Sequence, residues 1–400
     1  DGTVGYIKLT GFTEDASKEV KSAFLELKEK NKIKSLVFDL RDNGGGLLKE
    51  AVDIVNTFVD KNLTIVEQKG KIKEMNRTHK SQYNPIDTTM PVAVLINRNS
   101  ASASEIVSGS LQDLDRAVVV GQRSFGKGLV QQTLPLSYGT QVKVTTAKYY
   151  TPSGRCIQEL DYFHKSKSGK AETVPDSLIR EYKTKRGRSV YDGSGIYPDI
   201  ILEPRTYALI TGTIISKSYI FDYATKYRIA HSSIPAAKDF SLTESEYNKF
   251  LQYLSDKKYD YTTQTEKSLN ELKKNTEKEK YFESIKSSFE DLKAKVEANK
   301  KQDLTKYKKE IKEFLEEEIA ARYQYQRGRL ESSLRTDDEL KEAVKVLIDR
   351  QLYSSILAGK GTYKVIGKPG DVHAKANTSD KEDDMDEDDD NSDTTPKKEK

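Results

Sequence analysis

Residues 100–131 determine how the first half of this chain should fold, because they hold a helix start, a strand and a lysine loop in close succession. They begin with Ser100-Ala-Ser-Ala-Ser-Glu-Ile106, continue through Ala117-Val-Val-Val120 and end with Gly126-Lys-Gly-Leu-Val-Gln131. This order can bring Lys127 back beside Ser102, 25 positions earlier. A serine next to a lysine is one of the few arrangements that activate a nucleophile without histidine.

The sequence on either side alternates strand-like and helical patterns. Apolar strand patterns occur at 4–9, 35–40 and 92–97, and helical spacing follows residues 13 and 48. This alternation predicts an α/β core with a substantially parallel sheet over residues 1–205. Within it, residues of about 158–194 are rich in Lys, Ser, Gly and Arg, which indicates a surface insertion.

The rest of the chain has a different composition. Residues 206–360 are rich in Lys, Glu and Leu and nearly lack Gly and Pro beyond residue 240, which predicts an α-helical C-terminal region. Residues 361–400 predict a disordered acidic tail, since 371–400 contain 12 acidic and 5 basic residues. The net charge of +4 combines −7 in residues 371–400 with +11 in residues 1–370, where the lysines lie among glutamates on helical faces, so we expect no nucleic-acid partner.

Composition also limits the chemistry. A single cysteine, Cys156, excludes an internal disulfide framework and a cysteine-rich zinc site, and we expect neither a metal nor a cofactor. No run of 18 apolar residues could span a membrane. The chain begins at Asp1, without methionine, directly in a strand pattern, so we expect that an upstream segment is missing and that any membrane association would lie there.

A phosphate loop is one interpretation of the lysine loop. Gly121-Gln-Arg-Ser-Phe-Gly-Lys127 fits G-x-x-x-x-G-K after an apolar strand. However, Gly128 stands where Ser or Thr should hold magnesium, and the following residues predict a strand instead of a helix. The simplest alternative is a serine-capped helix and an exposed lysine with no joint role.

Together the residues better fit acyl transfer, which needs a nucleophile, a base and oxyanion donors. Ser102 would attack a carbonyl, and Lys127 would take its proton, although a lysine, with an ordinary pKa of about 10.4, must first be made neutral by burial. Gln131 could hold the amine. The N–H groups of Ala103 and of either Gly44 or Gly45, in the turn Arg41-Asp-Asn-Gly-Gly-Gly46, are suitable oxyanion donors.

Over residues 3–204 the chain resembles the carboxy-terminal processing proteases, also called tail-specific proteases. The matching motifs are Asp39-Leu-Arg-Asp-Asn-Gly-Gly-Gly46, Ser100-Ala-Ser-Ala-Ser-Glu-Ile106, Val120-Gly-Gln-Arg-Ser-Phe-Gly-Lys-Gly-Leu-Val-Gln131, Tyr150-Thr-Pro-Ser-Gly-Arg155 and Gly195-Ile-Tyr-Pro-Asp199. The resemblance implies a crotonase/Clp-protease-like core with Ser102 as nucleophile, Lys127 as general base and Gln131 as its orienting partner. It assigns the oxyanion hole to Gly45 and Ala103.

The resemblance also implies the activity and setting. We expect a serine endopeptidase that cleaves polypeptides near their C-terminal tails outside the cytoplasm, in a bacterial periplasm or cell envelope. The helical region would mediate self-association or bind an adaptor. The family's PDZ domain is not in this chain. The alternatives are an inactive peptide-binding module of the same fold and, less favoured, a nucleotide-binding protein using Gly121–Lys127.

Overall fold

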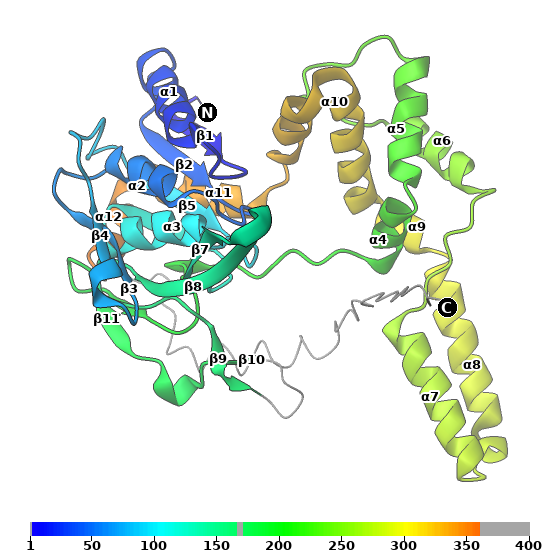
Figure 1. Cartoon of the computed structure of the whole chain (residues 1–400). Helices are drawn as coiled ribbons and strands as arrows, with labels where there is room; N and C mark the ends of the chain where they lie inside the picture. Colours follow the sequence, from blue (N-terminus) through cyan, green and yellow to red (C-terminus); the bar gives the residue numbers. More distant parts are fainter. Residues whose placement is uncertain (1, 166–170, 361–400) are drawn as a thin grey trace, which may run out of the picture. The chain divides into compact units, whose positions relative to one another are not determined.

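The computed structural model describes residues 2–165 and 171–360 and divides the chain into two compact units (Figure 1). The core unit is Asp1–Glu203 with Glu342–Lys400, and the helical unit is Pro204–Lys341. The boundary predicted after residue 205 lies close to Glu203, where the first segment of the core unit ends. The end of the predicted helical region, in contrast, returns to the core unit, and the predicted acidic tail lies outside the described residues.

The core unit contains a five-stranded parallel sheet. Its order is β1 (Val4–Lys8), β2 (Ser35–Asp39), β5 (Val92–Ile96), β6 (Ala117–Gly121) and β13 (Ile200–Ile201). The three central strands, β2, β5 and β6, are buried along their whole length, which explains why apolar residues occupy most of their positions. The predicted α/β core is therefore confirmed.

Helices cover this sheet. One side of the central strands contributes residues such as Phe38, Val94 and Val119 to a core shared with α1 (Ala16–Glu29), α2 (Leu48–Asn56) and α3 (Ala103–Asp113). The alternate residues, such as Leu95 and Val120, are equally buried but lie outside that cluster, as expected where successive side chains point to opposite faces. Helix α12 (Arg350–Leu357) packs on β6, so the end of the described chain belongs to the core.

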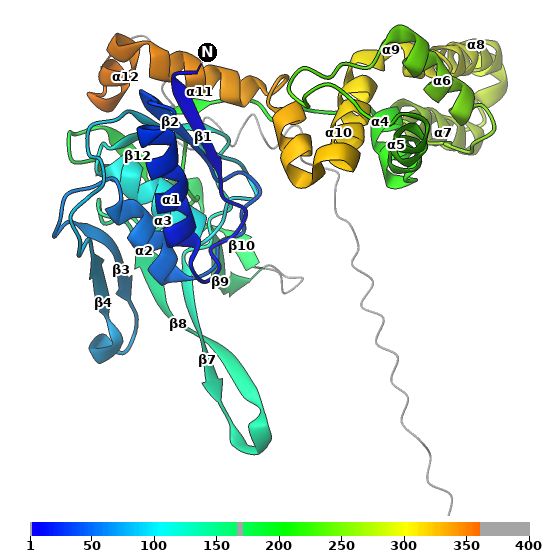
Figure 2. The same ribbon diagram turned by 90° about the horizontal axis from the view of Figure 1, so that it is seen from above.

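A second, antiparallel sheet has the order β4 (Arg77–Lys80), β3 (Thr64–Lys69), β8 (Gln141–Tyr150) and β7 (Leu129–Pro135). Strand β7 confirms the strand predicted after Gly128, and the hairpin that it forms with β8 extends well beyond the core (Figure 2). The predicted insertion contains two small sheets, β9 (Leu160–Lys165) with β10 (Ala171–Thr173) and β11 (Glu181–Lys183) with β12 (Ser189–Tyr191). Short 3-10 turns occupy Lys73–Met75, Ser137–Gly139 and Asp176–Leu178.

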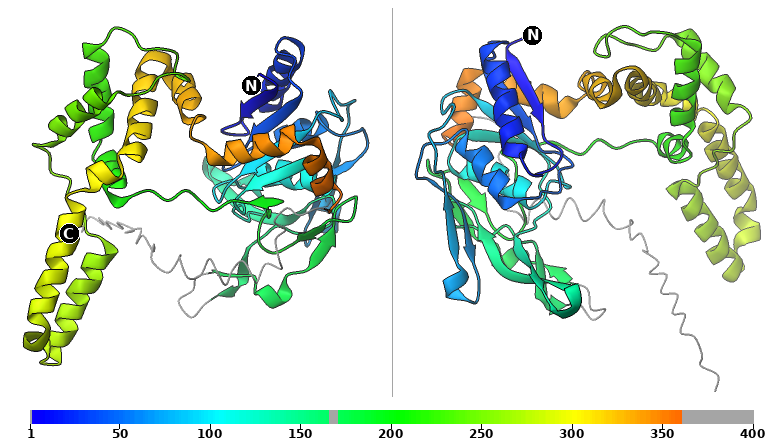
Figure 3. Two further views of the ribbon diagram at one scale, coloured as in Figure 1. Left: turned by 180° about the vertical axis from the view of Figure 1, so that it is seen from behind. Right: turned by 45° about the horizontal axis from the view of Figure 1, so that its top comes forward.

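The helical unit confirms the predicted α-helical region. It contains α4 (Leu209–Ser216), α5 (Tyr219–Ala230), α6 (Glu244–Leu254), α7 (Gln264–Lys278), α8 (Phe282–Lys300), α9 (Asp303–Lys306) and α10 (Lys308–Ser333), and α11 (Asp338–Ile348) begins in it. Its apolar core joins α4, α5, α6 and α10, whereas α7 and α8 form a long hairpin of their own (Figure 3). None of the helices in the described residues is both long and apolar enough to cross a membrane.

Candidate active site

Helix α3 begins directly after the loop that leaves β5, and Ser102 is its N-cap residue. The Ser102 backbone has φ 57° and ψ −111°, which a residue with a side chain rarely adopts. Backbone strain of this kind persists only where the surroundings impose it, and it often marks a functional position. The strain therefore singles out Ser102 within the serine cluster.

The other two serines of the cluster have structural partners. Ser100 and Ser104 are fully buried, and their hydroxyls donate to the Leu40 and Asn43 carbonyls, each at 2.8 Å. Ser102 alone among the three is partly exposed. The structure thus separates three serines that sequence spacing could not rank.

Glu105 connects the start of α3 to the lysine loop. Its carboxylate is fully buried and accepts four hydrogen bonds. One oxygen accepts from the Ser124 hydroxyl at 2.6 Å and the Gly126 N–H at 2.7 Å. The other accepts from the Ser102 N–H at 2.7 Å and the Lys127 N–H at 2.9 Å. Burial raises the pKa of the Glu105 carboxyl, although the four donors oppose that increase.

This shared oxygen brings Ser102 and Lys127 together. Their backbone nitrogens can be no farther apart than the sum of the two hydrogen-bond lengths to it. Lys127 is partly exposed, and within the described residues its ammonium has no hydrogen bond or ion pair. Gln131, on β7, is exposed, and its side chain has no hydrogen-bond partner in the described part of the chain. The predicted contact between Gln131 and Lys127 is therefore not formed.

The glycine turn after β2 lies against the same helix start. A side-chain carbon at Gly45, where φ is +100°, would lie 2.8 Å from Ser102 Cβ and 2.9 Å from the Ala103 nitrogen. The Ala103 N–H has no acceptor among the described residues, as is usual at the first position of a helix. The Gly45 N–H, however, donates to Asn43 Oδ1 at 2.9 Å. Gly45 is thus adjacent to Ser102 as predicted, but its donor is already engaged.

Side chains fix this turn to the loop that carries Ser102. Asp42 accepts from the Asn97 and Asn99 amides at 2.8 and 2.9 Å, and the Asp42 N–H donates to Asn97 at 3.0 Å. Burial alone would raise the pKa of Asp42, but these amides and the charges of Lys8 and Arg41 bring it below its ordinary value. The two loops follow the paired strands β2 and β5, at the end of a parallel sheet where ligands commonly bind.

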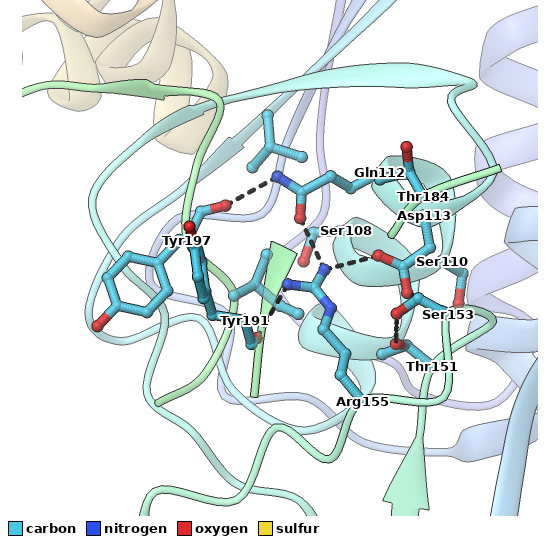
Figure 4. A network of polar contacts seen from close by, with 12 residues as sticks. Ser108, Ser110, Gln112, Asp113, Thr151, Ser153, Arg155, Thr184, Tyr191 and Tyr197 are labelled. Carbon is cyan, nitrogen blue, oxygen red and sulfur yellow. Dashed lines mark hydrogen bonds and ion pairs between the residues drawn. The ribbon is translucent and has the colours of Figure 1, made fainter. Parts of the chain in front are cut away.

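Buried ion pairs hold the opposite end of α3 (Figure 4). Arg155 has no exposed surface and donates to Asp113 at 2.8 Å, to Gln112 at 2.7 Å and to the Tyr191 carbonyl at 3.3 Å. Its Nε has no acceptor among the described residues. A helix of 11 residues is about 16 Å long, so this cluster is remote from Ser102.

A second arginine extends this cluster. Arg188 pairs with Asp115 at 2.7 Å and also with Asp199, and these two carboxylates raise its pKa although burial acts to lower it. The two arginines line a cavity of about 200 Å³ beside Gly359. Sequence reasoning missed these residues and Glu105. Glu105 could have been found, because a Glu three residues after a Ser is the pattern of a capping box.

The phosphate-loop interpretation of Gly121–Lys127 is wrong in this structure. A phosphate loop needs free backbone N–H groups followed by a helix. Here the Gly126 and Lys127 N–H groups donate to Glu105, and strand β7 follows. In the described ranges, no group of three or more His, Cys, Asp or Glu side chains is arranged to hold a metal ion.

Two parts of the chain match models of known protein families. Residues 3–162 match the model of peptidase family S41, and residues 210–347 match that of the C-terminal helical domain of a probable PDZ-protease. The carboxy-terminal-processing protease of Bartonella bacilliformis is 41% identical over 161 residues, which are 40% of this chain and 37% of that protein. The chloroplastic C-terminal processing peptidase of Tetradesmus obliquus is 38% identical over 158 residues, covering 39% and 33%.

A solved structure of the photosystem II D1 C-terminal processing protease aligns with a TM-score of 0.39 at 32% identity. The alignment covers 50% of this chain and 43% of that one. The present chain therefore spans about a third of the length of these curated relatives and less than half of the solved chain.

Proposed function

Residues 3–162 belong to peptidase family S41, and from this premise we propose that the protein is a serine endopeptidase that cleaves polypeptides near their C-terminal tails. Ser102 is the proposed nucleophile and Lys127 the proposed general base. The observation that carries the proposal is the Glu105 carboxylate, one oxygen of which binds the backbones of both residues. A buried group with this geometry is what a preorganised two-residue site requires.

The proposed reaction has two halves. Ser102 Oγ attacks the substrate carbonyl carbon while its proton passes to Lys127 Nζ, and the departing amine then takes that proton as the C–N bond breaks. In the second half, a water molecule gives a proton to Lys127 and attacks the ester carbon, and the proton returns to Ser102 as the acid product leaves. Lys127 can act only in its neutral form, so we expect the cleavage rate to rise with pH.

The negative oxygen formed in each half needs donors. The Ala103 N–H is free to donate. We propose that Gly45 supplies the second donor by turning its N–H from Asn43 toward the oxyanion, or by sharing it between the two acceptors. We also propose that Gln131 approaches Lys127 only when substrate is bound, since its side chain is unengaged in this structure.

Two broader proposals rest on the family alone. We expect the protein to act outside the cytoplasm, which fractionation of the producing cells would test. We also propose that the helical unit mediates self-association or adaptor binding, because its match is to a domain of PDZ-proteases. Light scattering of this chain, compared with a chain in which a short linker replaces only the helical unit, Pro204–Lys341, tests self-association.

The decisive experiment is cleavage of an unfolded protein substrate. Ser102→Ala and Lys127→Ala should each abolish cleavage while circular dichroism shows the fold retained, and Lys143→Ala, an exposed lysine on β8, should leave the rate unchanged. Unchanged cleavage in either site variant would refute the mechanism. Peptide binding without turnover by the unaltered chain would favour the inactive peptide-binding module instead.

A further inference from the structure

Strand β7 is an edge strand that begins at the candidate active site. In the order β4-β3-β8-β7, and among the residues that the structure describes, it pairs only with β8. An edge strand presents backbone N–H and C=O groups that another strand can bind. Every residue of β7 after Val130 is exposed, and Figure 2 shows the β7–β8 hairpin extending away from the rest of the core.

The hydrogen-bond alternation identifies which residues of β7 face the open edge. At the hairpin turn the Leu136 N–H donates to the Thr140 carbonyl at 2.8 Å, so Leu136 points its backbone toward β8. In an antiparallel pair alternate residues face the partner, so Gln131 and Thr133 point their N–H and C=O groups the other way. Pro135, the next outward position, has no N–H, and the usable edge ends there.

The open edge is the one that continues toward Ser102. The Gly128 carbonyl accepts from the Tyr149 N–H of β8 at 2.8 Å, so Gly128 faces β8. The Lys127 N–H points to the other side, where it meets the Glu105 oxygen that also binds the Ser102 N–H. Gln131 and Thr133 share this outward side with Lys127. At about 3.3 Å per residue they lie about 13 and 20 Å along the chain from Lys127, a distance that four to six extended residues span.

We propose that the polypeptide substrate binds as an added strand on the open edge of β7, with backbone hydrogen bonds to Gln131 and Thr133, and so delivers its carbonyl to Ser102. This deepens the proposed protease function and rests on it. Backbone hydrogen bonds tolerate many sequences, and they require an extended segment, so the substrate class is unfolded polypeptide.

Side chains on one face of the hairpin refine this class. Leu134 and Leu136 are 44% and 54% exposed, and Leu134 lies opposite Val142 on β8. Every second side chain of an added strand would project from the same face of the sheet as these leucines. We therefore expect a preference for apolar residues at alternate substrate positions.

The test uses a fluorescein-labelled, unstructured 12-residue peptide with alternating apolar residues, and binding is measured by anisotropy in the Ser102→Ala background. Thr133→Pro removes one outward N–H and leaves the bonds to β8, whereas Thr133→Val keeps the backbone and serves as the matched control. We expect Thr133→Pro to weaken binding about three- to tenfold relative to Thr133→Val, the effect of one lost hydrogen bond. Equal affinity for the two variants would overturn the proposal.

Methylating the peptide's amide nitrogens one at a time gives a second test, with no change to β7, in the same Ser102→Ala background. Methylation at alternate positions should weaken binding and methylation at the intervening positions should not, because successive amides of a strand face opposite sides. A uniform effect along the peptide would also overturn the proposal. Both assays measure binding without turnover, so they can fail while cleavage by Ser102 is confirmed, and the reverse also holds.

Discussion

Replacing Glu105 by Gln tests whether this side chain holds the site together. Gln keeps one acceptor oxygen and puts an NH₂ group in place of the other. If the NH₂ faced Ser102 and Lys127, both N–H groups would lose their acceptor. If it faced Ser124 and Gly126, the Ser124 hydroxyl could turn and accept from it beside the bond from the Ile196 N–H, so the Gly126 N–H would be the one backbone donor left without a partner. The second orientation is therefore preferred.

The preferred orientation sets the magnitude. One unsatisfied buried backbone donor costs about 1–3 kcal/mol, so Glu105→Gln should lower the free energy of unfolding by about that amount. It should retain measurable cleavage, because the link between Ser102 and Lys127 survives. Glu105→Ala removes the acceptor from three backbone N–H groups, for a loss of about 3–9 kcal/mol. That loss approaches the entire stability of an ordinary domain, about 5–15 kcal/mol.

Urea unfolding followed by circular dichroism measures these differences, and cleavage of the unfolded substrate measures the effect on the site. Glu50→Gln is the matched control, because this buried glutamate accepts from the Ser17 N–H through one oxygen, a bond that Gln can also accept. Its free energy of unfolding should change by less than about 1 kcal/mol. Equal destabilisation by Glu105→Gln and Glu105→Ala would refute the orientation argument, and a neutral Glu105→Gln would refute the role of the carboxylate.

Three other changes test separate features. Gly45→Ala should lower the free energy of unfolding by about 2–5 kcal/mol, because φ is +100° and the new carbon would lie 2.7 Å from the Ala101 carbonyl oxygen. Gly44→Ala is the control, since an added carbon there meets nothing within 4 Å, and it should be nearly neutral in the same urea titration. Tyr353→Phe should cost about 1–3 kcal/mol in thermal unfolding of the core, since the Val92 N–H donates to the Tyr353 hydroxyl; no change would mean that α12 is not an integral part of it. Burial, with help from neighbouring carboxylates, raises the pKa of Glu317 in the helical unit from 4.5 to about 7. The folded state therefore holds the proton more tightly than the unfolded state, and the free energy of unfolding falls as the pH rises from about 4.5 to 7. Glu317→Gln should therefore be more stable than the parent by up to about 3 kcal/mol at pH 8 and equal to it at pH 4, and an equal difference at both pH values would contradict this.

Local patterns predicted most of the core but not where the chain returns to it. The strands and the first three helices follow from apolar runs and helical spacing, which depend on neighbouring residues alone. The return of residues after Glu342 depends on long-range burial of Tyr353 and Ile356 in the core unit. Their surrounding composition is the same Lys, Glu and Leu mixture as in the helical unit, so no local signal marks the change.

Within the site, the sequence predicted which residues lie together but not the hydrogen bonds that they form. It placed Ser102, Lys127 and the glycine turn together because strand–helix topology brings such loops to one edge of a sheet. It could not show that Asn43 occupies the Gly45 N–H, because that depends on a side-chain rotamer. The sequence pattern also predicted that Gln131 would contact the Lys127 amine, but the Gln131 side chain is exposed on strand β7.

The strained backbone of Ser102 follows from its neighbours on both sides. The Ala101 N–H donates to the Asn43 carbonyl at 3.1 Å, and the Ser104 hydroxyl donates to the same carbonyl at 2.8 Å, so the glycine turn holds the residues flanking the nucleophile. Glu105 then holds the Ser102 N–H from the helix side. Strain of about 1–3 kcal/mol can be offset by these bonds, and none of them involves the Ser102 hydroxyl or the Lys127 amine. These bonds hold the backbone of Ser102, and Glu105, which accepts from both the Ser102 and the Lys127 N–H groups, fixes the start of α3 relative to the lysine loop.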